Sequence, residues 1–321
     1  MLASSAIRVR ALGESPVRGV VWQERRLPPA VQADRPDVFF SPAYSCPRRI
    51  ALPRVTAVHD FSFFSMPQDF TWLDGLRRRL STKATLALSA GVLACSDFTR
   101  REILARFPET EGRVHHVPLG PDDDVPPGPP RDEARSQLGV NGPMLLTVGA
   151  ILNRRRLPEL LRALQALRSD SPGVVLEVVG ENRTHPRLDF AALVRSLGLG
   201  ESVRLSGFVS DTELALRYAA ADAACCLSDY EGFGLPALEA LSRGLPLVTS
   251  RRPCLGEIFG EAAVLVEPAD VPGIASALGR VLRDEALRSD LVSRGRALAA
   301  RFSWQRTAAL TWDVLEAAAR A

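Results

Sequence analysis

The stretch that decides the organisation of this chain is Asp229-Tyr-Glu-Gly-Phe-Gly-Leu-Pro-Ala-Leu-Glu-Ala-Leu-Ser-Arg-Gly-Leu-Pro-Leu-Val-Thr-Ser250. Its pattern predicts the end of a strand, a glycine-rich turn, a helix opened by Pro236, and a second strand. Glu231 falls in the turn at the carboxyl end of the first strand, where open α/β sheets bind their ligands. Glu239 falls one turn into the helix, near the positive end of its dipole.

The turn between these two carboxylates can bind an anion. It begins with Gly232, and the backbone amides of Phe233, Gly234 and Leu235 have no preceding helical turn to donate to. An anion site next to two carboxylates suits a sugar that is joined to a diphosphate and a ribose.

Two other interpretations of the stretch explain less of it. Gly232, Gly234 and Ala237 also fit the loose dinucleotide fingerprint Gly-x-Gly-x-x-Ala. That fingerprint expects an acidic residue after the next strand, whereas residues 245–249 are followed by Ser-Arg-Arg. A tight turn before an ordinary amphipathic helix accounts for the glycines and leucines, but not for a glutamate in the turn. We therefore prefer nucleotide-sugar binding.

The composition is typical of a globular protein with two domains: 321 residues, of which 46% are hydrophobic and 24% charged. The formal net charge of +3 favours a small anionic ligand over nucleic acid, which usually needs a concentrated basic stripe. The longest nearly apolar run, residues 84–95, is too short to cross a bilayer, and residues 1–10 do not resemble a signal peptide. Five scattered cysteines predict buried free thiols, so we expect a cytoplasmic protein.

A linker rich in proline and glycine, residues 120–131, divides the chain. We predict one domain over residues 1–125 and a second over 126–303, in which strands and helices alternate as in a parallel sheet with helices on both faces. The linker contains Asp122-Asp123-Asp124, an Asp-x-Asp pattern that can bind a divalent cation, but a solvated acidic hinge is the simpler interpretation and we assign no metal. Asp211 is the expected N-cap of a helix in the second domain.

The stretch around Glu231 and Glu239 resembles the Glu-x₇-Glu signature of retaining glycosyltransferases with the GT-B fold, especially their large family 4. Residues 148–156 and 56–63 resemble the same family. The resemblance implies an α/β fold of two Rossmann-like domains whose parallel sheets face a cleft. It also implies that the last helix, residues 304–319, packs back on the first domain.

Two adjacent arginines, Arg154 and Arg155, follow a predicted strand and Gly149. They resemble the Arg-Lys pair with which the family binds the diphosphate of its donor. Negative charge builds on that diphosphate as the glycosidic bond breaks, so fixed cations there would stabilise the transition state more than the ground state. A solvated basic patch is the alternative in an arginine-rich chain.

The resemblance also implies places for the rest of the donor. The nucleotide base would lie near Phe208 and Val209, the ribose on Glu239, and the sugar near Glu231 and His59. Glu231 and His59, together with the two arginines, are therefore the expected catalytic residues. The donor would be a GDP- or UDP-linked sugar, with no further cofactor.

The function that the resemblance implies is retaining transfer of a mannosyl or glucosyl group to a polysaccharide or lipid-linked acceptor. A departing phosphate oxygen would take the proton of the acceptor hydroxyl, so neither an enzymic base nor a metal is needed. The segment that starts at Val20 matches a part of the relatives that lies after their first strand and glycine-rich loop, which predicts an incomplete first domain. The alternative is therefore a nucleotide-sugar-binding paralogue or partner subunit without turnover.

Residues 61–80 combine several aromatic residues with a run of three arginines. If Phe61, Phe63 and Trp72 are exposed, this segment can rest on the inner face of the membrane, as a lipid-linked acceptor would require. Core packing next to a solvated helix face is the commoner arrangement, and both interpretations stay open.

Overall fold

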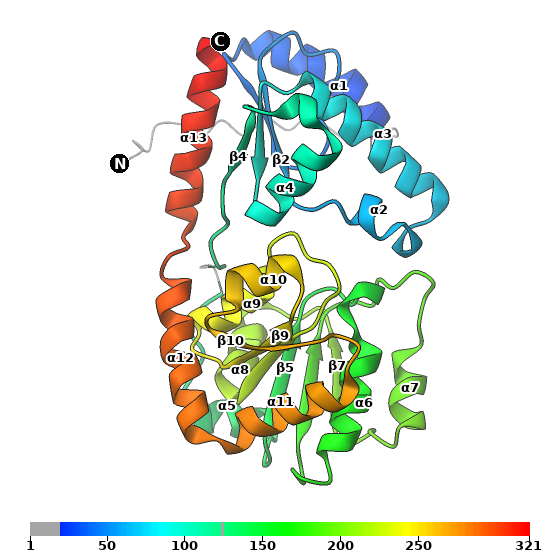
Figure 1. Ribbon diagram of the computed structural model, residues 1–321, viewed down its shortest axis with the longest axis vertical. Helices are drawn as coiled ribbons and strands as arrows, with labels where there is room; N and C mark the ends of the chain where they lie inside the picture. The colour runs from blue at the N-terminus through cyan, green and yellow to red at the C-terminus, as the bar shows by residue number, and fades with distance from the viewer. Residues whose placement is uncertain (1–19, 123–124) are drawn as a thin grey trace.

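The computed structural model describes residues 20–122 and 125–321, which form two lobes, one above the other in Figure 1. The first lobe contains a four-stranded sheet of order β1-β2-β3-β4, and the second a six-stranded sheet of order β10-β9-β8-β5-β6-β7. All neighbouring strands pair in parallel. The expected α/β class with two parallel sheets is therefore confirmed.

The strands of the two sheets are β1 (Phe39–Ser41), β2 (Arg54–Val58), β3 (Gly91–Ala94), β4 (Val114–His116), β5 (Met144–Val148), β6 (Val175–Val179), β7 (Val203–Gly207), β8 (Ala223–Cys226), β9 (Leu247–Ser250) and β10 (Ala263–Val266). The α-helices are α1 (Val20–Asp34), α2 (Ser62–Ser65), α3 (Trp72–Leu88), α4 (Asp97–Arg106), α5 (Arg131–Leu138), α6 (Leu157–Leu167), α7 (Phe190–Ser196), α8 (Asp211–Ala220), α9 (Leu235–Ser242), α10 (Pro253–Phe259), α11 (Val271–Arg283), α12 (Glu285–Ala299) and α13 (Trp304–Arg320). Three short 3₁₀ helices are η1 (Pro67–Asp69), η2 (Pro108–Thr110) and η3 (Asn153–Arg155).

The strand order of the second sheet reverses at β5. The chain leaves β5 to form β6 on one side and later returns to form β8 on the other. Open α/β sheets bind ligands at such a reversal, outside the carboxyl ends of the strands. Residues 149–156 follow β5 and residues 227–234 follow β8, so the topology brings these two segments together.

Leucines at helical spacing form part of the core of the second lobe. The buried side of α6 carries Leu157, Leu160, Leu161, Leu164 and Leu167. Each such side chain contributes about 1.5–3 kcal/mol when it leaves water.

Ser210, and not Asp211, is the N-cap of α8. The Ser210 hydroxyl accepts a hydrogen bond from the amide of Glu213 at 3.3 Å, and the Glu213 carboxylate accepts one from the amide of Ser210 at 3.0 Å. This reciprocal capping box satisfies two amides, which a cap at Asp211 would not do.

The two faces of the first sheet are covered by different elements. On one face Val58 packs with Phe61 and Phe63, which are 0% and 2% exposed. On the other face Ala57 packs with Val314 of α13. Phe61 and Phe63 are therefore core residues, which rules out their direct contact with a membrane.

Two chain segments cross between the lobes side by side. A side chain at Gly120, where the first lobe ends, would lie 2.4 Å from the backbone nitrogen of Trp304, where α13 begins. Only glycine allows this approach. Among the described residues, no helix combines the length and the apolar character needed to cross a membrane.

Candidate active site

Arg155 belongs to the loop that follows β5, and its side chain folds back against Gly149. Its Nε donates to Oε1 of Glu231 at 3.0 Å, and its Nη1 donates to the carbonyl oxygen of Val148 at 3.3 Å. A Cβ at Gly149, whose φ is +112°, would lie 2.1 Å from Nη1 of Arg155. Glycine is thus required here both for the backbone conformation and for the guanidinium beneath it.

The Arg155–Glu231 ion pair is largely shielded from solvent, with side chains 22% and 14% exposed. Burial alone would lower the pKa of Arg155, but the carboxylate of Glu231 raises it, so the guanidinium stays charged. Arg155, Glu231 and Gly234 line one cavity of about 20 Å³. The structure therefore brings together a cation, a carboxylate and the start of α9.

The turn before α9 has the geometry of an anion site. Gly234 is the N-cap of α9 at φ +99°, and Pro236 follows in the first turn. Within the described part of the chain, the amides of Phe233, Gly234 and Leu235 donate to no other residue. They remain available to a phosphate oxygen at the positive end of the helix.

Glu239 lies in a partly buried site beside α8. The hydroxyl of Tyr218 donates to Oε2 of Glu239 at 3.2 Å, and the guanidinium of Arg243 lies 4.9 Å from the centre of the Tyr218 ring. Burial raises the pKa of Glu239. The carboxylate is thus held by one neutral donor and keeps acceptor capacity for a ligand.

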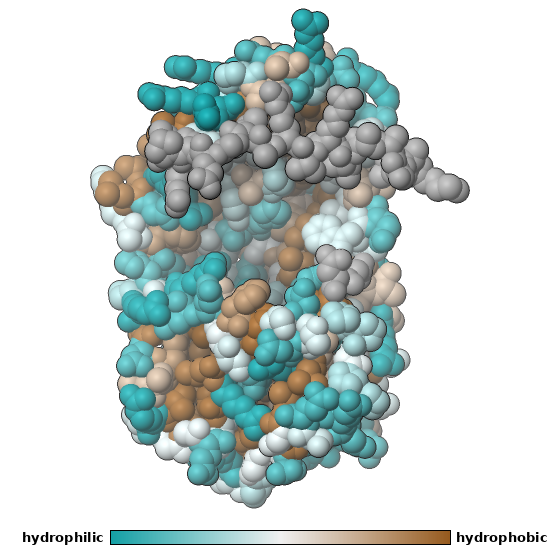
Figure 2. All heavy atoms as spheres, turned by 180° about the vertical axis from the view of Figure 1, so that it is seen from behind, coloured by the Kyte–Doolittle hydropathy of each residue, from teal (hydrophilic) through white to brown (hydrophobic). Residues whose placement is uncertain are grey.

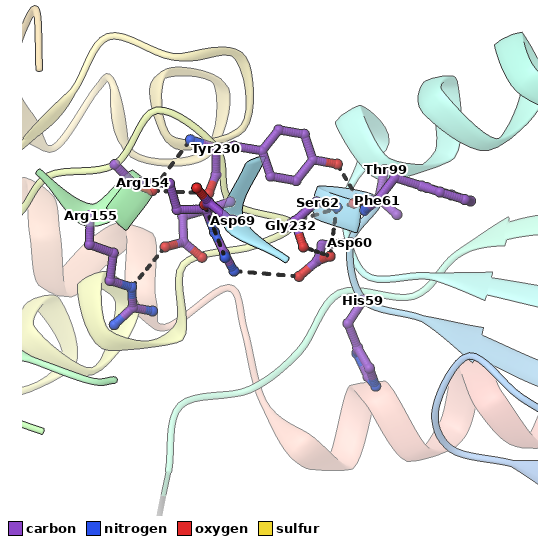
Figure 3. A network of polar contacts seen from close by, with 12 residues as sticks. His59, Asp60, Phe61, Ser62, Asp69, Thr99, Arg154, Arg155, Tyr230 and Gly232 are labelled. Carbon is purple, nitrogen blue, oxygen red and sulfur yellow. Dashed lines mark hydrogen bonds and ion pairs between the residues drawn. The ribbon is translucent and has the colours of Figure 1, made fainter. Parts of the chain in front are cut away.

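Arg154 has partners other than those expected. It is 9% exposed, with Nη2 3.9 Å from Oδ2 of Asp60 and Nη1 4.0 Å from Oδ2 of Asp69, both in the first lobe. Figure 3 shows Arg154 extending toward Asp60 and Arg155 turned away from it. The two arginines therefore lie in different environments, one between the lobes and one beside Glu231 and the turn before α9.

His59 follows β2 at the edge of the first lobe that faces the turn. Its Nε2 donates to the carbonyl oxygen of Pro42 at 2.8 Å, and its ring lies edge-on to Tyr44. A Cβ at Gly232 would lie 1.7 Å from the carbonyl oxygen of His59. The structure thus brings the backbone of His59 into close contact with the turn that carries Glu231.

Several polar interactions that hold this contact were not predicted from the sequence. The hydroxyl of Tyr230 accepts from the amide of Phe61 at 2.9 Å and donates to Glu102 of α4, and Thr99 donates to the carbonyl oxygen of Gly232 at 3.2 Å. We call the following set the interlobe clamp: Asp60, Asp69, Glu102, Arg154 and Tyr230. Tyr230 stands next to Glu231 in the sequence, but no local signal pairs it with Glu102.

Phe208 and Val209 lie in the loop after β7. Phe208 is 83% exposed, whereas Val209 packs against the core beside α9. The exposed ring is available for stacking, but no described residue encloses it. Asp123 and Asp124 of the acidic linker lie outside the described residues.

Two family models match the chain. The model described as glycosyl transferases group 1 matches residues 130–298, and the one described as glycosyltransferase family 4 matches residues 5–125. The O-antigen chain mannosyltransferase B of Escherichia coli is 31% identical over 273 residues, 84% of this chain and 71% of that protein. The MMP alpha-(1->4)-mannosyltransferase of Mycolicibacterium hassiacum is 36% identical over 231 residues. This match covers 71% of the chain but only 54% of that relative.

A solved structure shows the same fold. HepE of Anabaena, in complex with UDP-glucose, superimposes with a TM-score of 0.68 over 84% of this chain and 73% of that one, at 20% sequence identity.

Proposed function

The chain belongs to the family of glycosyl transferases group 1 and has the GT-B fold, and from that premise we propose that it is a retaining hexosyltransferase. It moves a mannosyl or glucosyl group from a nucleotide-diphosphate sugar to a polysaccharide or lipid-linked acceptor. The observation that carries this proposal is the Arg155–Glu231 pair at the strand reversal, next to the amides of residues 233–235, which have no acceptor among the described residues. The relatives named above are mannosyltransferases, and HepE binds UDP-glucose, which supports this donor class.

In this proposal Arg155 and the amides of residues 233–235 bind the diphosphate, and Glu239 accepts hydrogen bonds from the ribose hydroxyls. The bond between the anomeric carbon and the phosphate oxygen breaks while the acceptor oxygen bonds to the same face. The departing phosphate oxygen takes the proton of the acceptor hydroxyl. Arg155 stabilises the charge that develops on the leaving group. Glu231 holds the guanidinium in place, and His59 contacts the sugar or orients the acceptor.

Donor binding is tested by thermal shift with GDP-mannose, UDP-glucose and ADP-glucose. A donor at about a hundred times its dissociation constant should stabilise the protein by roughly 2.7 kcal/mol. At the same donor concentration Arg155→Ala should reduce this stabilisation to less than half. Arg183→Ala is the matched control, because that arginine is exposed and pairs only with Glu181 in the described structure. No shift with any donor would overturn the proposal.

Turnover is a separate measurement. Release of the nucleoside diphosphate in the presence of acceptor should fall to background in Glu231→Ala. A donor shift without turnover in the wild-type protein would favour the alternative of a nucleotide-sugar-binding paralogue or partner subunit.

Metal independence has its own test. In this proposal Arg155 and the amides at the start of α9 neutralise the charge of the diphosphate. We therefore expect transfer to persist in EDTA. A loss that Mg²⁺ or Mn²⁺ restores would contradict this assignment.

A cytoplasmic location, with peripheral contact at the inner face of the membrane, stays a prediction. Trp72 and Leu73 of α3 are each 71% exposed, next to the arginines of the same helix. Flotation with anionic vesicles, compared between the wild-type protein and Trp72→Ser, would measure the contact.

A further inference from the structure

An apolar groove of about 720 Å³ lies between α13 and the first sheet. We call it the α13 groove. Its sheet wall includes Phe40, Ala57 and Leu93, and its helix wall includes Ala308 and Trp312. The volume is within the roughly 300–1,000 Å³ of typical sites for small ligands. Seen from behind, the molecule is hollowed between its two lobes, and both hydrophobic and hydrophilic atoms are visible inside the hollow (Figure 2).

The inner end of the α13 groove adjoins the candidate active site. His59, Cys95 and Leu235 line it there. Leu235 is the first residue of α9, and the thiol of Cys95 donates to the carbonyl oxygen of Gly232 at 3.3 Å. A molecule in the groove would therefore extend directly from the place assigned to the acceptor.

Most of the polar side chains that line the groove already have partners among the described residues. Thr307 donates to the carbonyl oxygen of Pro118 at 2.6 Å, and Thr311 donates to that of Thr307 at 2.7 Å. His59 donates to Pro42. A glycan in the groove would lose its hydrogen bonds to water without replacement, which is unfavourable, whereas a hydrocarbon chain would lose none. The lining thus selects against a sugar polymer.

The outer rim exposes large apolar side chains. Phe40 is 38%, Trp304 42% and Trp312 52% exposed. A contiguous exposed apolar surface on a soluble lobe marks a place where another apolar molecule binds. Tryptophan, with its apolar ring and polar N–H, suits the boundary between such a molecule and water.

We propose that the α13 groove binds the hydrocarbon chain of a lipid-linked acceptor, with the glycan of that acceptor at His59. This inference rests on the proposed function and selects the lipid-linked class from its two acceptor classes. The continuity of the groove with the active site and its mainly apolar lining, in which both threonine hydroxyls are already paired, are the observations that carry it.

The four tryptophans of the chain permit a direct test. A Trp22→Phe, Trp72→Phe variant keeps only Trp304 and Trp312, which line the groove. Dodecyl maltoside brominated on its alkyl chain, below its micelle concentration, should quench this variant saturably. The reverse variant, Trp304→Phe with Trp312→Phe, is the matched control and should not be quenched. Equal quenching in both variants, or none in the groove pair, would overturn the proposal.

Filling the groove provides a second test. Ala308→Phe should weaken binding of dodecyl maltoside at least tenfold, whereas Ala309→Phe, at the next exposed position outside the groove, should not. In the wild-type protein each added methylene should strengthen binding about fourfold, so octyl maltoside should bind far more weakly than dodecyl maltoside. If a polypeptide segment occupies the groove instead, neither Ala308→Phe nor the length of the alkyl chain will change the binding of the maltoside. That result would refute the proposal.

The thermal shift with donor distinguishes a failure of the proposed function from a failure of the groove proposal. Ala308→Phe should keep the wild-type shift with GDP-mannose or UDP-glucose, which also shows that it folds. Arg155→Ala should lose more than half of that shift and keep the quenching. A wild-type protein that shows quenching without a donor shift would refute the proposed function, and one that shows a shift without quenching would refute the groove alone.

Discussion

Arg154 and Arg155 are adjacent in the chain but belong to different structures. The 3₁₀ turn of η3 directs them apart, and Arg156, at φ +49°, then starts α6. Arg155 turns under Gly149 to meet Glu231, while Arg154 reaches two carboxylates of the first lobe. Their substitutions should therefore have different consequences.

We predict that Arg155→Ala weakens donor binding by about 1.5–3 kcal/mol, the worth of a charge-assisted hydrogen bond. Arg154→Ala should mainly lower the melting temperature, because it leaves Asp60 and Asp69 without their cation. Calorimetric titration with donor and thermal unfolding distinguish the two effects. Equal losses of donor affinity in both variants would instead place Arg154 on the diphosphate, as the sequence resemblance implied.

A second prediction at this scale concerns Glu239. Burial raises its pKa, and only the ionised carboxylate can accept hydrogen bonds from both ribose hydroxyls. Donor binding should therefore weaken as the pH falls, starting above the value of about 4.3 at which an ordinary glutamate titrates. Glu239→Gln should flatten this dependence, whereas Glu257→Gln, at an exposed surface pair, should not. The donor-free protein should behave oppositely: ionising Glu239 costs stability as the pH rises through the raised pKa.

At the scale of elements, the turn that joins β8 to α9 determines how closely the lobes approach. Gly232 faces the carbonyl oxygen of His59, and its own carbonyl accepts from Thr99. A methyl group here would force the turn away from the end of β2.

We predict that Gly232→Ala reduces turnover by at least tenfold and lowers the melting temperature, since the new Cβ would lie 1.7 Å from the His59 oxygen. Gly200→Ala is the control, because a Cβ there meets nothing within 4 Å. Steady-state kinetics and thermal unfolding provide the measurements. Wild-type turnover in Gly232→Ala would show that this contact is not needed for the reaction.

At the scale of the whole molecule, the connections between the lobes include the segment after Gly120, the start of α13 and the interlobe clamp. The clamp inserts Tyr230 of the second lobe into the aromatic core of the first, beside Phe61 and Phe98. Burial and the neighbouring Glu102 raise the pKa of Tyr230, so its hydroxyl stays a donor. The clamp thereby positions the Glu231 turn against the first lobe.

We predict that Tyr230→Phe destabilises the protein by about 1–3 kcal/mol, because the Phe61 amide and Oε2 of Glu102 lose their hydrogen bonds to its hydroxyl. Urea unfolding of Tyr230→Phe, Glu102→Gln and the double variant forms a cycle that isolates their coupling. Additive effects would mean that the two residues do not act together. With the clamp weakened, the lobes should unfold in two separable steps.

Much of the second lobe could be predicted from local sequence. The glycine turn, the proline at the start of α9 and the leucine stripe of α6 each act within a few residues, so their conformations follow from nearby chemistry. The position of Glu231 after β8 and of Arg155 after β5 then follows from the strand reversal of a parallel sheet. One detail was wrong, because the cap of α8 is Ser210 and not Asp211. For Phe61 and Phe63, where the sequence left two interpretations open, the structure shows core packing.

By itself, then, the sequence determined the fold class and the local structure around Glu231, because short-range propensities and strand order suffice for both. Only the tertiary structure decided that Arg154 faces the first lobe, that Tyr230 enters its core, and that an apolar groove opens beside His59. Each of these joins residues that are more than 80 positions apart in the chain. Such contacts depend on how two independently patterned surfaces meet, which no local pattern encodes.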